Sequence, residues 1–207
     1  MVKLLPPPPT KLPAPVVFTM PKRQVLYRIF DPSKFDARAS DFRDFGPISR
    51  FDHHRARFNE PEADSERSVM YAGFSVTCCL VEVFGDCKRI ETGNYEVGKI
   101  LTLESMRLLD LRKDGAMRAG SVAALTKDGR FCISQQWSKF FYENKFLYGE
   151  IDGLIYGNAH NDEDSVVFYE RAKNKSKCES LGGLNSKKFE DTIDAAAADF
   201  GLDIECF

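Results

Sequence analysis

Short runs of β-branched and aromatic residues alternate along the chain with segments of helical periodicity. Val25–Phe30 and residues 68–72 are the first two such runs, and both predict strands. The second run leads directly into residues 74–84, whose length and apolar content predict a helix. Glu82 is the one charged residue in that helix.

Glu82 lies in a largely apolar part of the predicted helix. Cys79 and Cys78 precede it by three and four positions, and Phe74 precedes it by eight, so they share its face. A carboxylate in such surroundings requires a partner or a chemical role. The alternative, from this segment alone, is a glutamate at the solvated edge of the helix.

The rest of the chain mixes both kinds of element, which predicts an α/β mixed (α+β) fold. Strands are predicted at 89–91, 108–111, 154–156, 165–170 and after residue 201, the two at 154–156 and 165–170 forming a hairpin. Helices are predicted at about 116–125, 132–144 and 189–200. Trp137, Phe140 and Phe141 form an apolar stripe on the second of these, which we assign to the core.

Several segments lack such patterns. Residues 1–20 predict a proline-rich arm, polyproline-like or loosely draped over a single domain at 21–207. Residues 33–67 predict a long loop region, and loops of this length often carry functional residues. Turn-rich segments are predicted between the strands at 89–91 and 108–111, and again before residue 188.

Composition narrows the classes of function. The 29 basic and 31 acidic residues nearly cancel, so the chain lacks the basic excess that binds a phosphate backbone, and direct nucleic-acid binding is disfavoured. No apolar run reaches the roughly 20 residues of a membrane-spanning helix. Prolines occupy the place of a signal peptide's apolar region, so we expect no membrane association and a cytoplasmic protein. The six cysteines show neither zinc-type spacing nor a disulfide framework, which predicts reduced thiols and no metal site.

Four motifs occur in a fixed order after the arm. They are Tyr27-Arg28 in the first strand, Arg50-Phe-Asp-His-His in the loop, Tyr71-Ala before the helix of Glu82, and Asp152-Gly-Leu-Ile-Tyr in a later strand. In this order and rough spacing the chain resembles the RES domain family, which is named for an arginine, a glutamate and a serine. The resemblance covers nearly everything after the proline-rich start.

The resemblance implies a fold similar to that of ADP-ribosyltransferases, with small twisted sheets around a cleft and helices packed outside. It also implies an NAD-degrading enzyme that cleaves the nicotinamide–ribose bond by phosphorolysis or hydrolysis. Members of the family often act as the toxin of a toxin–antitoxin pair. The expected ligands are therefore NAD as substrate and inorganic phosphate as a co-substrate, with no further cofactor. A small antitoxin that blocks the cleft is the expected partner, and assembly into a homo-oligomer is left open.

The expected chemistry needs three groups. A carboxylate near the ribose stabilises an oxocarbenium-like transition state, and the resemblance assigns this role to Glu82. Guanidinium groups hold the pyrophosphate, and the matching residues are Arg28 and Arg50. An aromatic face holds the nicotinamide, and the matching residue is Tyr71. Glu82, Arg28 and Tyr71 are thus the predicted catalytic residues.

Asn158 stands at the position of the family serine, where the chain reads Tyr156-Gly-Asn-Ala-His160. Asparagine can still donate and accept hydrogen bonds, so we assign Asn158 to the binding of the substrate. Its larger size motivates a second hypothesis, a catalytically inactive module that binds a nucleotide or a partner. A third is an ADP-ribosyltransferase acting on a macromolecule, which would use the same glutamate.

Each of these residues also has a structural interpretation. Arg28 could be half of an ion pair within the fold, and Tyr71 could belong to the core. Arg57-Phe repeats the pattern of Arg50-Phe, and only the surrounding motif favours the earlier arginine. His53 and His54 could contact phosphate, but loop histidines without ligand spacing more often serve packing.

Overall fold

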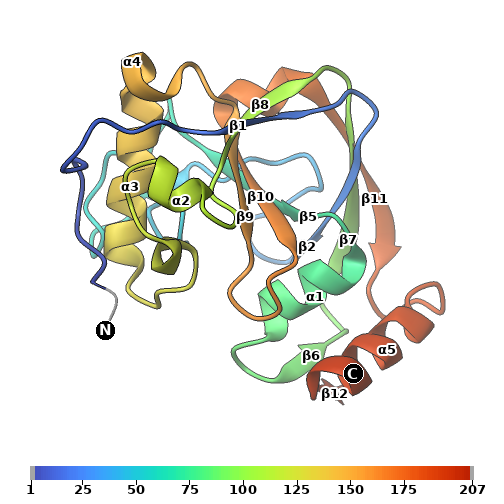
Figure 1. Ribbon diagram of the computed structural model, residues 1–207. Coiled ribbons are helices and arrows are strands. Elements are labelled where there is room, and N and C mark those ends of the chain that lie inside the picture. Colours follow the sequence, from blue (N-terminus) through green and yellow to red (C-terminus); the bar gives the residue numbers. More distant parts are fainter. Residues whose placement is uncertain (1–2, 206–207) are drawn as a thin grey trace.

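Eight strands form one curled sheet at the centre of the computed structural model, which describes residues 3–205 (Figure 1). Neighbouring strands are antiparallel except for one parallel pair, β8 with β9. The order across the sheet is β1 (Val17–Met20), β8 (Met106–Asp110), β9 (Gly153–Gly157), β10 (Asp164–Tyr169), β5 (Val69–Gly73), β2 (Val25–Phe30), β7 (Glu96–Thr102) and β11 (Ser176–Gly183). The mixed α/β prediction is confirmed, with most strands in one sheet larger than the small sheets expected.

Two short strand pairs lie outside this sheet. β3 (Phe45–Gly46) pairs with β4 (Glu62–Ala63) within the long loop region. β6 (Arg89–Glu91) pairs in parallel with β12 (Asp203–Glu205), so the predicted closing strand is present.

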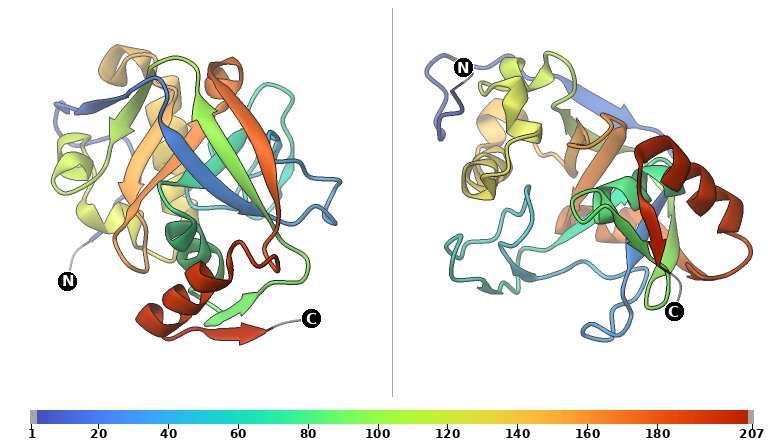
Figure 2. Two further views of the ribbon diagram at one scale, coloured as in Figure 1. Left: turned by 90° about the vertical axis from the view of Figure 1, so that its right-hand side faces the viewer. Right: turned by 90° about the horizontal axis from the view of Figure 1, so that it is seen from below.

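Helices cover the two ends of the sheet. Figure 1 shows α3 (Phe131–Glu143) and α4 (Lys145–Tyr148) at one end, and α1 (Val76–Phe84) with α5 (Glu190–Phe200) at the other. α5 lies beside α1 in both views of Figure 2. The predicted core stripe of α3 is confirmed for Trp137 and Phe141, which are buried, and Phe140 packs against the same cluster.

The predicted helix at 116–125 is wrong. It is divided into α2 (Gly115–Arg118) and a short 3-10 helix, η1 (Ala123–Thr126). The cause is Gly120, whose φ of +94° lies in the left-handed region and ends the first helix.

Two strands lie in segments predicted to be turns. β7 lies between β2 and the edge strand β11, and its Gly98 lies where a Cβ would come within 3.0 Å of the Arg28 side chain. β11 is an edge strand with little apolar alternation, and it is held by its pairing with β7. A second 3-10 helix, η2 (Glu170–Lys175), precedes it. The backbone pairing of β7 with β11 leaves no periodic pattern of apolar residues in either segment.

The proline-rich arm is fastened to the domain at several points. Leu4 is buried in the cluster around α3, and the indole Nε1 of Trp137 donates to the carbonyl of Leu5 at 2.8 Å. At the far end of the arm, Val17–Met20 form β1 and pair with β8. The arm therefore packs along the domain rather than projecting from it.

Candidate functional site

A small pocket of about 60 Å³ opens between β2, β5, α1 and the β9–β10 hairpin. Its lining includes three residues predicted for the site, Arg28, Tyr71 and Glu82, together with Cys78, Tyr156 and Ser165. The structure thus brings together residues that are 54 positions apart in the sequence, from 28 to 82. The space is enough for a few water molecules and is far smaller than a dinucleotide.

Glu82 reaches the pocket from the last turn of α1. The helix begins after Ser75, whose side chain accepts a hydrogen bond from the backbone N–H of Cys78 at 2.9 Å. Within the described residues, the Oε2 atom of Glu82 is buried without a hydrogen-bond partner. Burial raises the pKa of this carboxyl, and the positive charge of Arg50 opposes that shift. Glu82 is therefore a poorly solvated carboxylate that faces a cavity.

Arg28 projects from β2 into the same pocket. Its Nη1 donates to the backbone carbonyls of Asp41 at 2.7 Å and Ala39 at 3.4 Å, while its Nε is buried without a partner in the described chain. Burial lowers the pKa of this guanidinium. Carbonyl dipoles compensate a buried cation less fully than a carboxylate does, so the site favours an added anion.

Tyr71 lies on β5 and contributes its ring to the pocket wall. Its hydroxyl is fully engaged elsewhere, because it accepts from the backbone N–H of Phe51 at 2.9 Å and donates to Asp52 at 3.0 Å. Burial raises the pKa of the phenol well above its usual value. The ring, rather than the hydroxyl, is the part of Tyr71 available to a ligand.

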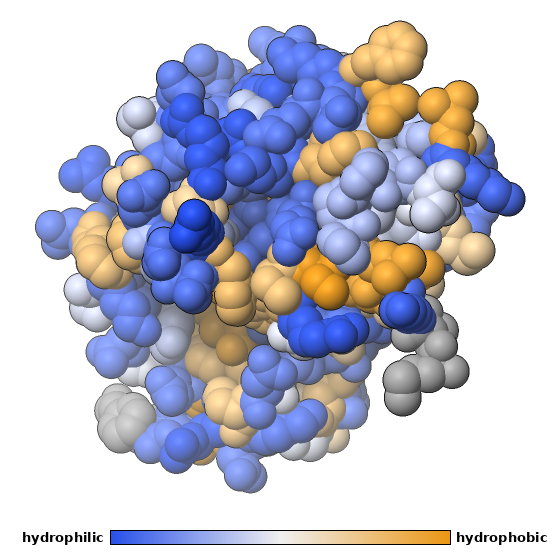
Figure 3. Space-filling view, turned by 90° about the vertical axis from the view of Figure 1, so that its left-hand side faces the viewer, coloured by the Kyte–Doolittle hydropathy of each residue, from blue (hydrophilic) through white to orange (hydrophobic). Residues whose placement is uncertain are grey.

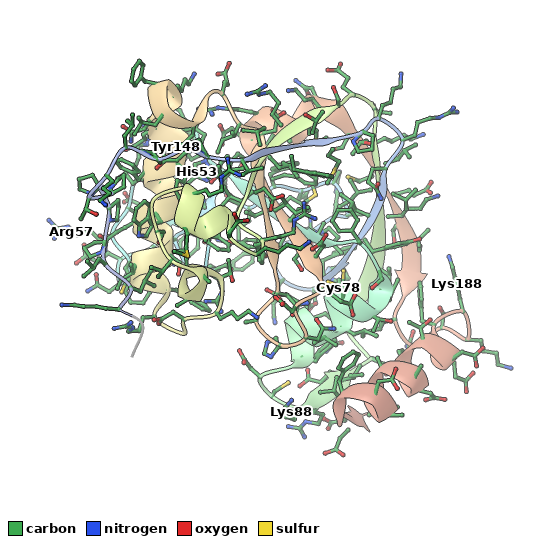
Figure 4. All side chains as sticks on the ribbon, viewed as in Figure 1. His53, Arg57, Cys78, Lys88, Tyr148 and Lys188 are labelled. Carbon is green, nitrogen blue, oxygen red and sulfur yellow. The ribbon has the colours of Figure 1, made fainter. Side chains whose placement is uncertain are left out.

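Arg50 lies beside the pocket rather than among its lining residues. Its Nη1 donates to the carbonyl of Asp128, and its guanidinium carbon lies 4.8 Å from the centre of the Phe131 ring. Its charge nevertheless acts on Glu82. Arg57, the alternative, is exposed and projects away from the domain, far from Cys78 at the pocket (Figure 4). The geometry therefore favours Arg50.

Asn158 is buried beneath the pocket, beyond its lining. Its Oδ1 accepts from the backbone N–H groups of His160 at 3.0 Å and Asn161 at 2.9 Å, which shapes the turn of the β9–β10 hairpin. Its Nδ2 contacts the Sγ of Cys78 at 3.5 Å. The side chain is thus occupied by the fold.

Ser165 is a pocket residue that the motifs did not indicate. It lies in β10 opposite Gly73 and Tyr156, and its Oγ lies 3.3 Å from the Sγ of Cys78. The alternation of β10 could have pointed to it, because Ser165 and Asp164 must face opposite sides of the sheet. Alternation alone does not distinguish Ser165 from the other polar residues of the chain.

His53 and His54 are buried in the loop interior and do not line the pocket. The Nε2 of His53 lies 3.0 Å from Glu170, and its ring packs against Tyr142 and Tyr169. The packing interpretation of these two histidines is therefore the one that the geometry supports. Over residues 3–205 no group of histidine, cysteine and acidic side chains could hold a metal ion.

A larger groove of about 500 Å³ lies on the other side of the hairpin. Its lining includes Arg112, which pairs with Asp110 at 2.6 Å and with Asp164 at 2.5 Å. These charges satisfy one another, whereas the charges of the small pocket do not.

The outer surface is largely polar. On the face that carries α3 and α4, hydrophobic side chains form separate patches among hydrophilic ones (Figure 3). Leu12 and Phe146 are strongly exposed. Among the described residues, no helix has the length and apolar content needed to span a bilayer.

The sequence profile of the RES domain matches residues 25–182. The chain belongs to the RES domain family. The match includes Arg28, Arg50, Tyr71, Glu82 and Asn158, and it ends before α5.

Among solved structures, the chain is similar to one described as the crystal structure of the M. tuberculosis MbcT-MbcA toxin-antitoxin complex. The identity is 11%, the TM-score is 0.46, and the alignment covers 79% of this chain and 86% of the other. No curated protein matched this RES protein.

Proposed function

We propose that this RES protein cleaves the nicotinamide–ribose bond of NAD. The observation that carries the proposal is the pocket shared by Arg28, Tyr71 and Glu82, in which neither charged group has a close partner of opposite sign among residues 3–205. Perturbed and uncompensated charges in one cavity are typical of functional sites rather than of packing.

The charges of NAD complement those of the pocket. Its pyridinium ring is cationic and its pyrophosphate is anionic, so one molecule offers a partner to both Glu82 and Arg28. The ring of Tyr71 supplies a face for the nicotinamide. Arg50 would add a second contact to the phosphates, provided that it leaves the carbonyl of Asp128.

The proposed reaction needs little help for its leaving group. Nicotinamide departs as a neutral base with the electron pair of the glycosidic bond, and the ribose develops oxocarbenium character at C1′. The Glu82 carboxylate stabilises that positive charge. An oxygen of inorganic phosphate or of water then bonds to C1′, giving a phosphorylated or a free ADP-ribose.

The size of the pocket adds a requirement. About 60 Å³ cannot enclose NAD, so binding needs the side chain of Arg50 to move away from Asp128 and Phe131. NAD would then lie partly in the widened pocket and partly along its mouth.

The role that fits this activity is that of a cytoplasmic toxin controlled by an antitoxin that covers the mouth of the pocket. Expression in a bacterial host should deplete NAD and stop growth, and Glu82→Gln should relieve both effects. A variant that stops growth as strongly as the wild type would contradict the toxin role at this site.

The direct test uses purified protein and NAD, with and without phosphate, followed by identification of the products. Nicotinamide should appear with either ADP-ribose or its phosphorylated form, and Glu82→Gln should reduce the rate about 100-fold or more. Transfer of ADP-ribose to a macromolecule would instead leave little free ADP-ribose. Equal NAD loss from both proteins would exclude Glu82 as the catalytic group.

A nucleotide-binding module without catalytic activity is the second candidate. It is favoured by Asn158, whose side chain is fully used by the hairpin turn where the family has a serine. This candidate predicts that NAD or ADP-ribose binds, as measured by calorimetry, and that no nicotinamide is released.

A further inference from the structure

Asp52 is the most heavily hydrogen-bonded carboxylate near the pocket, although it does not line it. Its two oxygens accept from Nη2 of Arg43, each at 2.9 Å. They also accept from the backbone N–H groups of Ile48 at 2.7 Å and Ser49 at 2.9 Å, and from the hydroxyl of Tyr71 at 3.0 Å. The side chain is completely buried.

We propose that Asp52 is a positioning residue that fixes the ring of Tyr71 and the backbone around Arg50. The proposal rests on the proposed function for its effect on turnover, but its structural part can be measured without any substrate. Asp52 would act through these two neighbours and would not touch NAD.

The first connection runs through the tyrosine. A ring hinged at β5 could swing at its far end, but the hydroxyl of Tyr71 is held by a donor, the N–H of Phe51, and an acceptor, Asp52. These bonds fix the ring plane against the pocket. The same arrangement argues against a proton relay from the hydroxyl to the substrate, because the hydroxyl donates its proton to Asp52.

The second connection runs through the loop. Ser49 is held from one side by Asp52 and from the other by Gln135, whose Nε2 donates to the Ser49 carbonyl at 2.9 Å. Phe51 is held by the Tyr71 hydroxyl, and its carbonyl accepts from Ser138 at 2.6 Å.

Arg50 stands between these two anchored residues. Its backbone is therefore restrained on both sides, while its side chain is held by the carbonyl of Asp128 and the ring of Phe131, contacts that it can exchange without moving the backbone. This is the arrangement expected where a side chain must exchange an internal partner for a ligand.

The net charge of the cluster is consistent with an organising role. Arg43 neutralises Asp52, so the loop holds a buried carboxylate without an unpaired charge. Replacing Asp52 by asparagine retains its size, but puts an NH₂ group where N–H donors now converge. That substitution should loosen the loop while leaving the pocket residues themselves unchanged.

The experiment compares Asp52→Asn with a matched control, Asp64→Asn. Asp64 is also a nearly buried carboxylate of this loop region, but its partner is Arg55 and it does not line the pocket. In the protein without substrate, amide hydrogen exchange at Ile48, Ser49 and Phe51 should be at least about tenfold faster in Asp52→Asn than in the control. Equal protection in both variants would overturn the proposal, whatever activity the wild type has.

Turnover provides the second measurement. If NAD is cleaved, Asp52→Asn should lower kcat by about 10- to 100-fold with a smaller change in KM, and Asp64→Asn should change neither by more than about twofold. Because Asp52 acts partly through the Tyr71 hydroxyl, its effect should shrink in a Tyr71→Phe background. Full additivity, or an unchanged kcat, would contradict positioning.

Tyr71→Phe also serves if Asp52→Asn fails to fold. It keeps the ring and removes only the hydroxyl, so faster exchange confined to Phe51 and its neighbours supports the proposal, and unchanged exchange overturns it. Absence of NAD cleavage by the wild type would count against the proposed function alone, because the exchange data are independent of it.

Discussion

Arg28 and Glu82 carry opposite charges into one pocket without forming an ion pair with each other in the described chain. Arg28 instead donates to the carbonyls of Ala39 and Asp41, and the Oε2 of Glu82 has no hydrogen-bond partner among residues 3–205. Keeping two charges desolvated and separate costs folding free energy. A ligand that satisfies both would recover it, which explains how a stability cost can be maintained at a binding site.

Replacement of Glu82 should therefore separate stability from activity. Because burial raises the pKa of Glu82, the neutral form suits the fold better, and this contribution to stability is lost as pH rises through the folded pKa. At neutral pH, Glu82→Gln should melt at or above the wild-type temperature while losing activity about 100-fold. Thermal unfolding and NAD turnover measure the two effects.

A matched control for this variant is Glu179→Gln, since Glu179 pairs with Lys99 on the exposed edge of the sheet. It should leave both the melting temperature and the rate nearly unchanged. A clear fall in the melting temperature of Glu82→Gln would show that the carboxylate stabilises the fold.

Ser165 should contribute to activity and Asn158 to stability, although the sequence motifs assign substrate binding to Asn158. Ser165→Ala removes the hydroxyl that lines the pocket and should lower kcat/KM by about tenfold with little change in stability. Asn158→Ala removes the acceptor for two backbone N–H groups of the hairpin turn, and should cost about 1–3 kcal/mol of stability. Chemical denaturation and steady-state kinetics on both variants distinguish the roles.

The opposite effects of these two variants would contradict this assignment. If Asn158→Ala lost activity without losing stability, while Ser165→Ala remained fully active, then Asn158 would contact the substrate directly. That result would require the hairpin to change conformation when NAD binds.

The motifs were enough to predict that Arg28, Tyr71 and Glu82 converge. The motifs could not identify the other site residues, because their positions depend on tertiary contacts. Arg50 and Arg57 stand in the same Arg-Phe pattern, and only the packing of one against Phe131 separates them. Ser165 reaches the pocket through the register of β10.

The prediction of two strands failed for a related reason. Residues 96–102 and 176–183 were predicted as turns because neither segment shows a clear apolar face. β11 becomes a strand by pairing with β7, and β7 by pairing with both β2 and β11; hydrogen bonds between backbones carry no signature in side-chain patterns. Elements with their own apolar stripe, such as α3, were predicted well because burial fixes them.

Acid should destabilise the protein through its two buried histidines. Burial lowers the pKa of His53 and His54, so their contribution to stability is full above the unfolded pKa of about 6.5 and is lost as pH falls below it. Glu170 adds a further loss at lower pH, because burial raises its pKa but hydrogen bonds from His53 and Tyr142 outweigh that and lower it to about 2, so its stabilising contribution disappears as pH falls towards that value. The free energy of unfolding should therefore begin to decline as pH falls below about 6.5.

Urea denaturation at several pH values measures this decline, and two variants assign it. His54→Phe should flatten the pH dependence, since neither ring nitrogen of His54 has a hydrogen-bond partner in the described chain. His160→Ala, at a more exposed histidine in the β9–β10 turn, is the comparison and should change the slope less than His54→Phe does. Equal slopes in all three proteins would assign the acid sensitivity to other groups.

The segment after the RES match should support the helix that carries Glu82. Ile193 and Ala196 of α5 pack in one apolar cluster with Leu80 and Phe84 of α1. Ile193→Ala should cost about 2–5 kcal/mol, because it leaves a cavity against α1.

If this contact also holds Glu82 in place, kcat should fall severalfold under conditions in which the variant remains folded, since an error of about 1 Å in a catalytic group is costly. Asp199→Ala, on the exposed side of α5, is the control and should change neither quantity by much. Circular dichroism gives the folded fraction at the assay temperature. A destabilised but fully active Ile193→Ala would show that α5 stabilises the fold without positioning the carboxylate.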